Sequence, residues 1–259
     1  MQSKDKIPYP SLKFLFIPLV LLIGFSGLAQ SELYEEPVII YSNQTYGGLN
    51  LHSNGAGAFL NFGKYRTAKK IMIFGFDVLY LKHEKEIKSY NPVYDDARSY
   101  VLGKMNNFYM VRPGIGVERI LTEKLRKSGV QVSYTWQVGP TLGITKPVYL
   151  EIAYPGIAYD YLVVERYNPD AHYSNNIYGK ASGLNGLDEL KIHPGAFVKF
   201  AFQFEYSNEK NRLKGLEAGM VVDAFPQDIP ILAEKYEQNK QLFFNFYLNL
   251  FIGQKYIKR

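Results

Sequence analysis

The chain of 259 residues contains no cysteine, and this absence excludes several classes of protein at once. Without thiols there is no disulfide framework, no thiolate-bound zinc or iron–sulfur cluster and no cysteine nucleophile. Only four histidines are present, and their spacing does not match that of zinc ligands. A phosphate-binding loop is also lacking, since the Gly114-Ile115-Gly116 stretch lies within an alternating, strand-like segment. We therefore expect neither a metal nor a cofactor.

Long apolar runs and a strong charge excess are lacking as well. After residue 29, no stretch approaches the roughly 20 apolar residues that a membrane-spanning helix needs. The net charge of +6 is modest and forms no strong basic stripe, so we expect no nucleic-acid partner. What the chain has in abundance is aromatic residues, which make up 15% of it and include 22 Tyr and 17 Phe.

The first 29 residues have the organisation of a secretory signal peptide. Lysines precede a short apolar run, Phe14–Phe25, and small residues come after it up to Ala29. A helical anchor is the alternative, but the run is shorter than a bilayer requires and contains Pro18. We expect cleavage near Ala29, which leaves 30–259 as the folded part.

Strict alternation of apolar and polar residues is the strongest pattern in the remaining chain. From Val130 to Ile144 the even positions are all apolar, whereas the odd positions hold only Gln, Ser, Thr and Gly. Because successive side chains of a strand point to opposite faces, this period of two predicts a strand with one apolar and one polar face. Segments of this kind span 45–53, 55–66, 70–82, 109–119, 130–144, 196–206, 214–224 and 242–256.

Short and long connections between these segments alternate. The short ones lie around 67–69, 123–128 and 208–211, and the long ones span about 84–106, 146–194 and 226–240. Short periplasmic turns and long outer loops are typical of outer-membrane barrels. We predict an all-β fold, a transmembrane antiparallel up-and-down β-barrel of about eight strands, with 146–194 as a long extracellular loop or hairpin. A soluble β-sandwich or lipocalin-like barrel is the alternative.

The polar faces of the predicted strands carry charged residues that would be costly in the core of a sandwich but suit a polar lumen. They are Arg112, Glu118, Lys199, Glu205, Glu217 and Asp223. We expect them to pair as a polar network, and a narrow ion-conducting path is the alternative. An interior enclosed by eight strands is just wide enough for side chains to fill, which excludes a wide pore.

Over essentially all of residues 30–259 the chain resembles small eight-stranded outer-membrane β-barrel proteins of Gram-negative bacteria, and most of all uncharacterised barrels of the Bacteroidota. The resembling stretches are NFYMVRPGIGVER (107–119), GPTLGITKPVYLE (139–151), NNIYGKASGLNGLDELKIHPG (175–195) and the aromatic last strand. The last strand resembles the signal read by the barrel-insertion machinery, although it ends in IKR after Tyr256. This resemblance implies an outer-membrane location and assembly by that machinery, but no established activity.

One pair of residues suggests catalysis. His172 and Ser174 lie two residues apart, and so share a face if the backbone is extended. A histidine oriented by Glu151, Glu165 or Glu189 could deprotonate the serine and form a nucleophilic esterase site. The stretch resembles the His-x-Ser-Asn of outer-membrane lipid A deacylases, although there the pair lies on a lipid-facing strand and here it falls in a long loop. A solvated loop histidine is the alternative.

We therefore expect a non-enzymatic protein with a structural or accessory role, as part of an outer-membrane complex. Its outer loops or its lipid-facing wall would contact outer-membrane lipid, including lipopolysaccharide, or other outer-membrane proteins. The deacylase-like esterase and the narrow ion channel are the alternatives.

Overall fold

A computed structural model describes residues 41–124, 129–156 and 160–257. The predicted signal peptide, 1–29, and its cleavage site near Ala29 lie outside the described residues. Within the described ranges no helix is long and apolar enough to cross a membrane.

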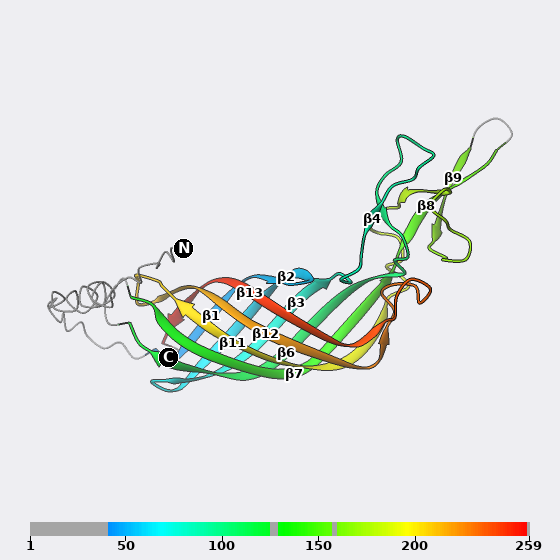
Figure 1. Cartoon of the computed structure of the whole chain (residues 1–259). Helices are drawn as coiled ribbons and strands as arrows, with labels where there is room; N and C mark the ends of the chain where they lie inside the picture. The colour runs from blue at the N-terminus through cyan, green and yellow to red at the C-terminus, as the bar shows by residue number, and fades with distance from the viewer. Residues whose placement is uncertain (1–40, 125–128, 157–159, 258–259) are drawn as a thin grey trace, which may run out of the picture. The chain divides into compact units, whose positions relative to one another are not determined.

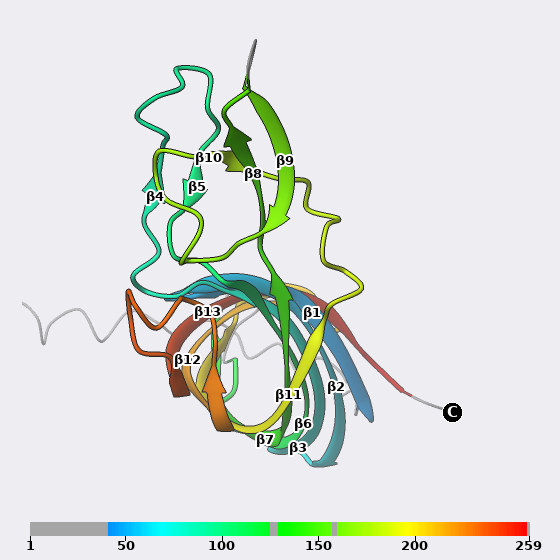
Figure 2. The same ribbon diagram turned by 90° about the vertical axis from the view of Figure 1, so that its right-hand side faces the viewer.

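Eight antiparallel strands close into an up-and-down barrel (Figures 1 and 2). They are β1 (Asn43–His52), β2 (Gly55–Thr67), β3 (Lys70–Leu81), β6 (Asn106–Thr122), β7 (Gln131–Pro147), β11 (Lys191–Glu205), β12 (Arg212–Ile229) and β13 (Lys240–Tyr256). Strands adjacent along the barrel are also consecutive in sequence, and the ring closes where β13 pairs with β1. All eight predicted segments are barrel strands, which confirms the fold class.

Several strands run beyond the segments that alternation predicts. β7 continues to Pro147, past a lysine at the even position 146, and β11 begins at Lys191, before the segment that alternation predicts. The outward side of a strand must be apolar only where it faces hydrocarbon, so the alternation fades where the strand continues past the membrane.

The alternation sorts side chains between an apolar wall and a filled lumen. On β11, Val198, Phe200 and Phe202 are exposed, whereas Lys199 and Ala201 between them are buried. Aromatic side chains stand on the outward face near both ends of the barrel, for example Tyr109 near one end and Tyr206 near the other. An exposed apolar band flanked by aromatic residues is the surface of a transmembrane barrel.

The two ends of the barrel differ. The short β2–β3, β6–β7 and β11–β12 turns lie at one end, and the long connections leave from the other (Figure 1). By the asymmetry of outer-membrane barrels, the short-turn end is periplasmic and the long-loop end is extracellular.

Two of the long connections fold together into a second structure, here called the outer lobe, residues 82–105 and 148–190. Its strands are β4 (Lys88–Ser89), β5 (Tyr100–Val101), β8 (Tyr149–Tyr154), β9 (Tyr161–Arg166) and β10 (Ile177–Lys180). A three-stranded sheet has the order β10-β8-β9, and β4 pairs with β5. The lobe has its own apolar core, built from Tyr100, Val148, Leu150, Ile152, Tyr167 and Ile177. The segment expected as a long loop or hairpin thus contains the β8–β9 hairpin.

A charge on the outer wall should destabilise the barrel according to its depth in the membrane. Leu248 lies near the middle of the outward face of β13, and Ile252 lies four residues closer to the short-turn end. We expect Leu248→Lys to cost about 2–4 kcal/mol and Ile252→Lys about 0–1 kcal/mol. Urea titration of the barrel in lipid vesicles measures both, and equal costs would contradict the assigned membrane depth.

Candidate functional site

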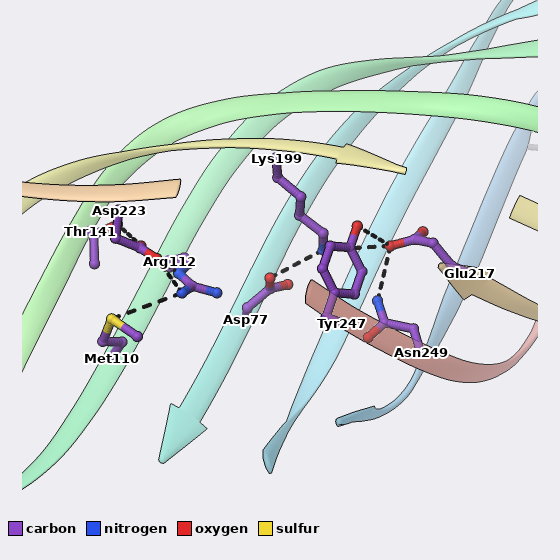
Figure 3. A network of polar contacts seen from close by, with 9 residues as sticks. All are labelled: Asp77, Met110, Arg112, Thr141, Lys199, Glu217, Asp223, Tyr247 and Asn249. Carbon is purple, nitrogen blue, oxygen red and sulfur yellow. Dashed lines mark hydrogen bonds and ion pairs between the residues drawn. The ribbon is translucent and has the colours of Figure 1, made fainter. Parts of the chain in front are cut away.

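A bidentate ion pair crosses the lumen in its long-loop half (Figure 3). Arg112 on β6 donates from Nε to Oδ1 of Asp223 on β12 over 2.7 Å, and from Nη2 to Oδ2 of the same carboxylate. The hydroxyl of Thr141 donates to the same Oδ1 over 2.9 Å. Both charged side chains are 0% exposed. A buried pair of this kind is tolerated because each partner compensates the other and hydrogen bonds satisfy the remaining lone pairs.

A second group surrounds Lys199 on β11. Its ammonium lies 3.2 Å from Oδ2 of Asp77 and 3.7 Å from Oε1 of Glu217. The hydroxyl of Tyr247 and the amide of Asn249 donate to that oxygen of Glu217 over 2.8 and 2.9 Å. Figure 3 shows these side chains converging from strands on opposite sides of the barrel.

The remaining predicted lumen residues lie nearer the short-turn end. Glu205 accepts from Lys124 and Lys255, each over 2.9 Å. Glu118 accepts instead from Gln44 over 2.8 Å and from Ser133 over 2.9 Å, without a cation among its described partners. Five of the six predicted residues are thus brought into ion pairs, and the sixth is held by neutral donors.

Sequence reasoning left Asp77 out of this network. The signal was present, because Asp77 occupies an inward position of β3, on the same face as Gly75. Alternation does not predict that Asp77 meets Lys199 across the lumen, because this depends on how far β3 and β11 are shifted relative to each other along the barrel axis.

Apolar layers separate the charged groups along the lumen. Tyr46, Phe59, Leu213 and Phe251 fill it toward the short turns. At the long-loop end it is filled by Leu79, Leu81, Phe108, Met110, Phe225, Ile229, Ile231 and Phe243. An ion crossing this interior would have to displace packed rings and break buried ion pairs, which argues against the narrow-channel hypothesis.

His172 is buried and its ring is fully engaged. The backbone N–H of Asn168 donates to Nδ1 over 3.1 Å, so the ring proton resides on Nε2, 3.2 Å from Oε2 of Glu165. The histidine is 2% exposed, which corrects the alternative of a solvated loop residue. Its role in this geometry is to tie the Asn168 turn to β9.

Ser174 is not brought to His172. The chain turns at this point, since the N–H groups of Asn176 and Ile177 both donate to the carbonyl of Tyr173. The extended backbone that would place the two side chains on one face is therefore absent here, and Ser174 is exposed while His172 is buried. With Nδ1 occupied by a backbone N–H, the ring offers no basic nitrogen to a serine hydroxyl.

The three carboxylates considered as partners of His172 are all engaged in holding the lobe together. Glu165 also accepts from the hydroxyl of Tyr154 over 3.1 Å, and this hydrogen bond raises the pKa of Tyr154 above its ordinary value. Glu151 pairs with Arg98, and Glu189 accepts from Tyr149 and Arg166. These contacts join β8, β9 and the neighbouring loops of the lobe.

Backbone hydrogen bonds attach the lobe to the barrel. The N–H of Met105 donates to Ile231 in the β12–β13 connection over 2.9 Å, and the N–H of Ala233 in that connection donates to Gly103 over 2.8 Å. Gly103 has a φ of 81° at this junction, where an added Cβ would lie 2.7 Å from the ring of Tyr236. Glycine therefore suits this position on both backbone and steric grounds.

Among the strands that the structure describes, β9 has a neighbour on one side only, and it is therefore an edge of the lobe sheet. The N–H of Tyr167 donates to Val148 before β8, so in this antiparallel pair the backbone groups of Leu162, Val164 and Arg166 point away from β8. The opposite edge is covered, because the N–H of Arg98 donates to Tyr178 on β10 over 3.0 Å. Leu162 and Val164 are each 48% exposed, which gives the free edge an apolar side.

No group of three or more metal-ligating side chains is placed to hold an ion in the part of the chain that the structure describes.

Comparisons with known proteins agree in fold class only. No protein-family profile matches the chain, and no curated protein sequence matches it. The structure is similar to Ail, the attachment invasion locus protein of Yersinia pestis, with 9% identity, a TM-score of 0.41, and coverage of 84% of this chain and 100% of that one. Neisserial surface protein A is 10% identical, with a TM-score of 0.40 and coverage of 83% of this chain and 96% of that one. OprG from Pseudomonas aeruginosa is 8% identical, with a TM-score of 0.36 and coverage of 84% of this chain and 97% of that one. The closed eight-stranded barrel is established by the pairing of its own strands. No residue role is transferred at such identities, and the resemblance to Bacteroidota barrels stays a prediction.

Removing one partner of the buried ion pair should be more damaging than removing both. We expect Arg112→Met to destabilise the barrel by about 3–5 kcal/mol, because Asp223 is left as an uncompensated buried charge. The double variant Arg112→Met/Asp223→Leu should recover most of this loss. Urea titration in lipid vesicles measures both, and a single variant no less stable than the double one would contradict the pairing.

The esterase hypothesis has a direct chemical test. We expect lipid A to have the same mass in cells that produce the wild-type chain, His172→Ala or Ser174→Ala, because no base reaches the serine. Mass spectrometry of extracted lipid A measures this. Loss of an acyl chain in wild-type cells that both substitutions abolish would restore the esterase.

Proposed function

We propose that the protein is a non-enzymatic accessory subunit of an outer-membrane complex, in which the barrel anchors the outer lobe and the lobe binds a protein partner. The observation that carries this proposal is the apolar edge of β9, which has no neighbouring strand on one side among the described residues. Exposed sheet edges in natural proteins are normally shortened, charged or covered, because they pair readily with other chains.

The chemistry of the edge indicates how a partner binds. An extended segment that pairs with β9 finds outward N–H and C=O groups at Leu162, Val164 and Arg166. Main-chain hydrogen bonds supply affinity in this mode, and alternate side chains supply selectivity. Leu162 and Val164 favour a partner strand with apolar side chains at the facing positions.

The rest of the molecule provides rigidity rather than chemistry. The lobe core and its tyrosine–carboxylate contacts hold β9 in place, as the Tyr94–Asp160 hydrogen bond of 2.5 Å just before the strand illustrates. A preformed edge loses little conformational entropy when a partner adds to it. The barrel end to which the lobe is attached is filled by packed apolar side chains, which supports the lobe.

Replacing Val164 with proline tests this function by removing a single backbone N–H group from the edge of β9. The N–H of Val164 points away from β8, so proline removes a donor from the outer edge while the β8–β9 hydrogen bonds stay intact. We expect a tagged Val164→Pro chain, extracted from native outer membranes in mild detergent, to retain its lobe fold and to recover at least about tenfold less partner protein, since the lost hydrogen bond and the ring's steric clash both weaken pairing.

The control is Val93→Lys, which changes another exposed apolar residue of the lobe, 63% exposed against 48% for Val164, outside β9. Its partner recovery should equal that of the wild type in quantitative mass spectrometry. A chain that purifies without a stoichiometric protein, or a partner retained by Val164→Pro at the wild-type level, would contradict the proposed function.

A further inference from the structure

A crevice of about 440 Å³ lies on the outer wall of the barrel at its short-turn end. Its lining consists of Thr67, Lys69, Lys70, Val117, Arg119, Tyr134 and Trp136. Val117 and Arg119 occupy outward positions of β6, and Tyr134 and Trp136 occupy outward positions of β7. The crevice therefore opens toward the membrane and not toward the lumen.

Its positive charge is concentrated and unbalanced. Lys70 on β3 stands directly opposite Arg119 on β6, and like charges in facing positions destabilise a sheet. Within residues 41–124, 129–156 and 160–257, no carboxylate forms an ion pair with Lys69, Lys70 or Arg119. Glu118, next to Arg119 in the chain, points into the lumen instead. The arrangement is explained if an anion occupies the crevice.

The surroundings specify an anion with apolar tails. Toward the middle of the barrel the neighbouring outward residues are apolar and exposed, among them Met72 and Phe74 on β3 and Ile115 on β6. Trp136 stands opposite Val117, between this apolar wall and the basic groups, and Tyr134 stands directly opposite Arg119. Aromatic rings take this level in a membrane interface. An amphiphile bound here places its chains along the wall and its headgroup among the cations.

The topology selects the class of lipid. Thr67, Lys69 and Lys70 of the lining belong to the β2–β3 turn and its flanking residues. This turn lies at the end of the barrel that carries the short turns (Figure 1), which we expect to face the periplasm. The periplasmic leaflet of an outer membrane consists of phospholipid, whereas lipopolysaccharide occupies the outer leaflet. Basic pockets on the wall of membrane proteins bind anionic headgroups of this kind.

We propose that the crevice formed by Lys69, Lys70, Arg119, Tyr134 and Trp136 is a binding site for the headgroup of an anionic phospholipid of the periplasmic leaflet. The bound phosphate lies between Lys70 and Arg119 and relieves their mutual repulsion. The site is independent of the outer lobe and of its protein partner.

Native mass spectrometry of the purified, folded chain with added lipid tests the proposal. The probes are dioleoyl phosphatidylglycerol and dioleoyl phosphatidylcholine, which share acyl chains and differ in headgroup charge. We expect one phosphatidylglycerol to bind in preference to phosphatidylcholine. The triple variant Lys69→Gln/Lys70→Gln/Arg119→Gln should bind phosphatidylglycerol about a hundredfold more weakly.

The control Lys82→Gln/Lys88→Gln/Lys191→Gln removes the same charge from exposed lysines at the long-loop end. It should bind phosphatidylglycerol as the wild type does. Equal binding of the two lipids, or equal loss of phosphatidylglycerol in the two triple variants, would overturn the proposal, because both outcomes indicate attraction by net charge alone.

The single variant Arg119→Gln keeps the test valid if the triple variant does not fold. Removing one of two facing cations should leave the urea midpoint in phosphatidylcholine vesicles unchanged or higher, while the rise in midpoint on adding phosphatidylglycerol becomes smaller. An unchanged rise would contradict the site.

Discussion

Satisfaction of backbone hydrogen bonds inside a membrane is the constraint on which the rest of the structure depends. Lipid offers no donors or acceptors, so strands can cross only as a closed ring in which every backbone group has a neighbour. Closure between β1 and β13 meets this requirement and divides the side chains into a lipid-facing and a lumen-facing set. The lumen of eight strands is narrow, so its polar side chains pair with one another, as Arg112 does with Asp223.

Sequence alone predicts the features that local periodicity determines. Alternation on the strand around Phe200 places Lys199 inside and its aromatic neighbours outside, and the structure shows the same division. The partners of Lys199 could not be predicted from the sequence, because Asp77 lies 122 residues away in the chain. The two side chains meet only because the barrel closes and because β3 and β11 place them at the same level along the barrel axis. The environment of His172 could not be predicted from the sequence either, because the residue lies beside a turn, where side chains follow no regular period. In a turn, two residues spaced as His172 and Ser174 are do not share a face.

Because the lumen is filled, the surfaces left for binding are the two ends of the barrel and its outer wall. On the long-loop side, the lobe holds β9 as an apolar edge that lacks a neighbour among the described strands. On the short-turn side, Lys70 and Arg119 face each other without an acidic partner among the described residues. Both features are locally unfavourable in isolation, and we propose a different external group for each, a partner strand at β9 and an anionic headgroup between Lys70 and Arg119.

Both proposals depend on which end of the barrel faces outward, so the most direct test is the accessibility of single cysteines in intact cells. The chain contains no cysteine, so each introduced thiol is the only one. Leu187→Cys is placed in the exposed surface of the lobe, and Glu209→Cys in the exposed β11–β12 turn. A maleimide that does not cross the outer membrane should label the thiol at position 187 in intact cells and the thiol at position 209 only after permeabilisation. Labelling with the opposite pattern would invert the barrel and contradict the account.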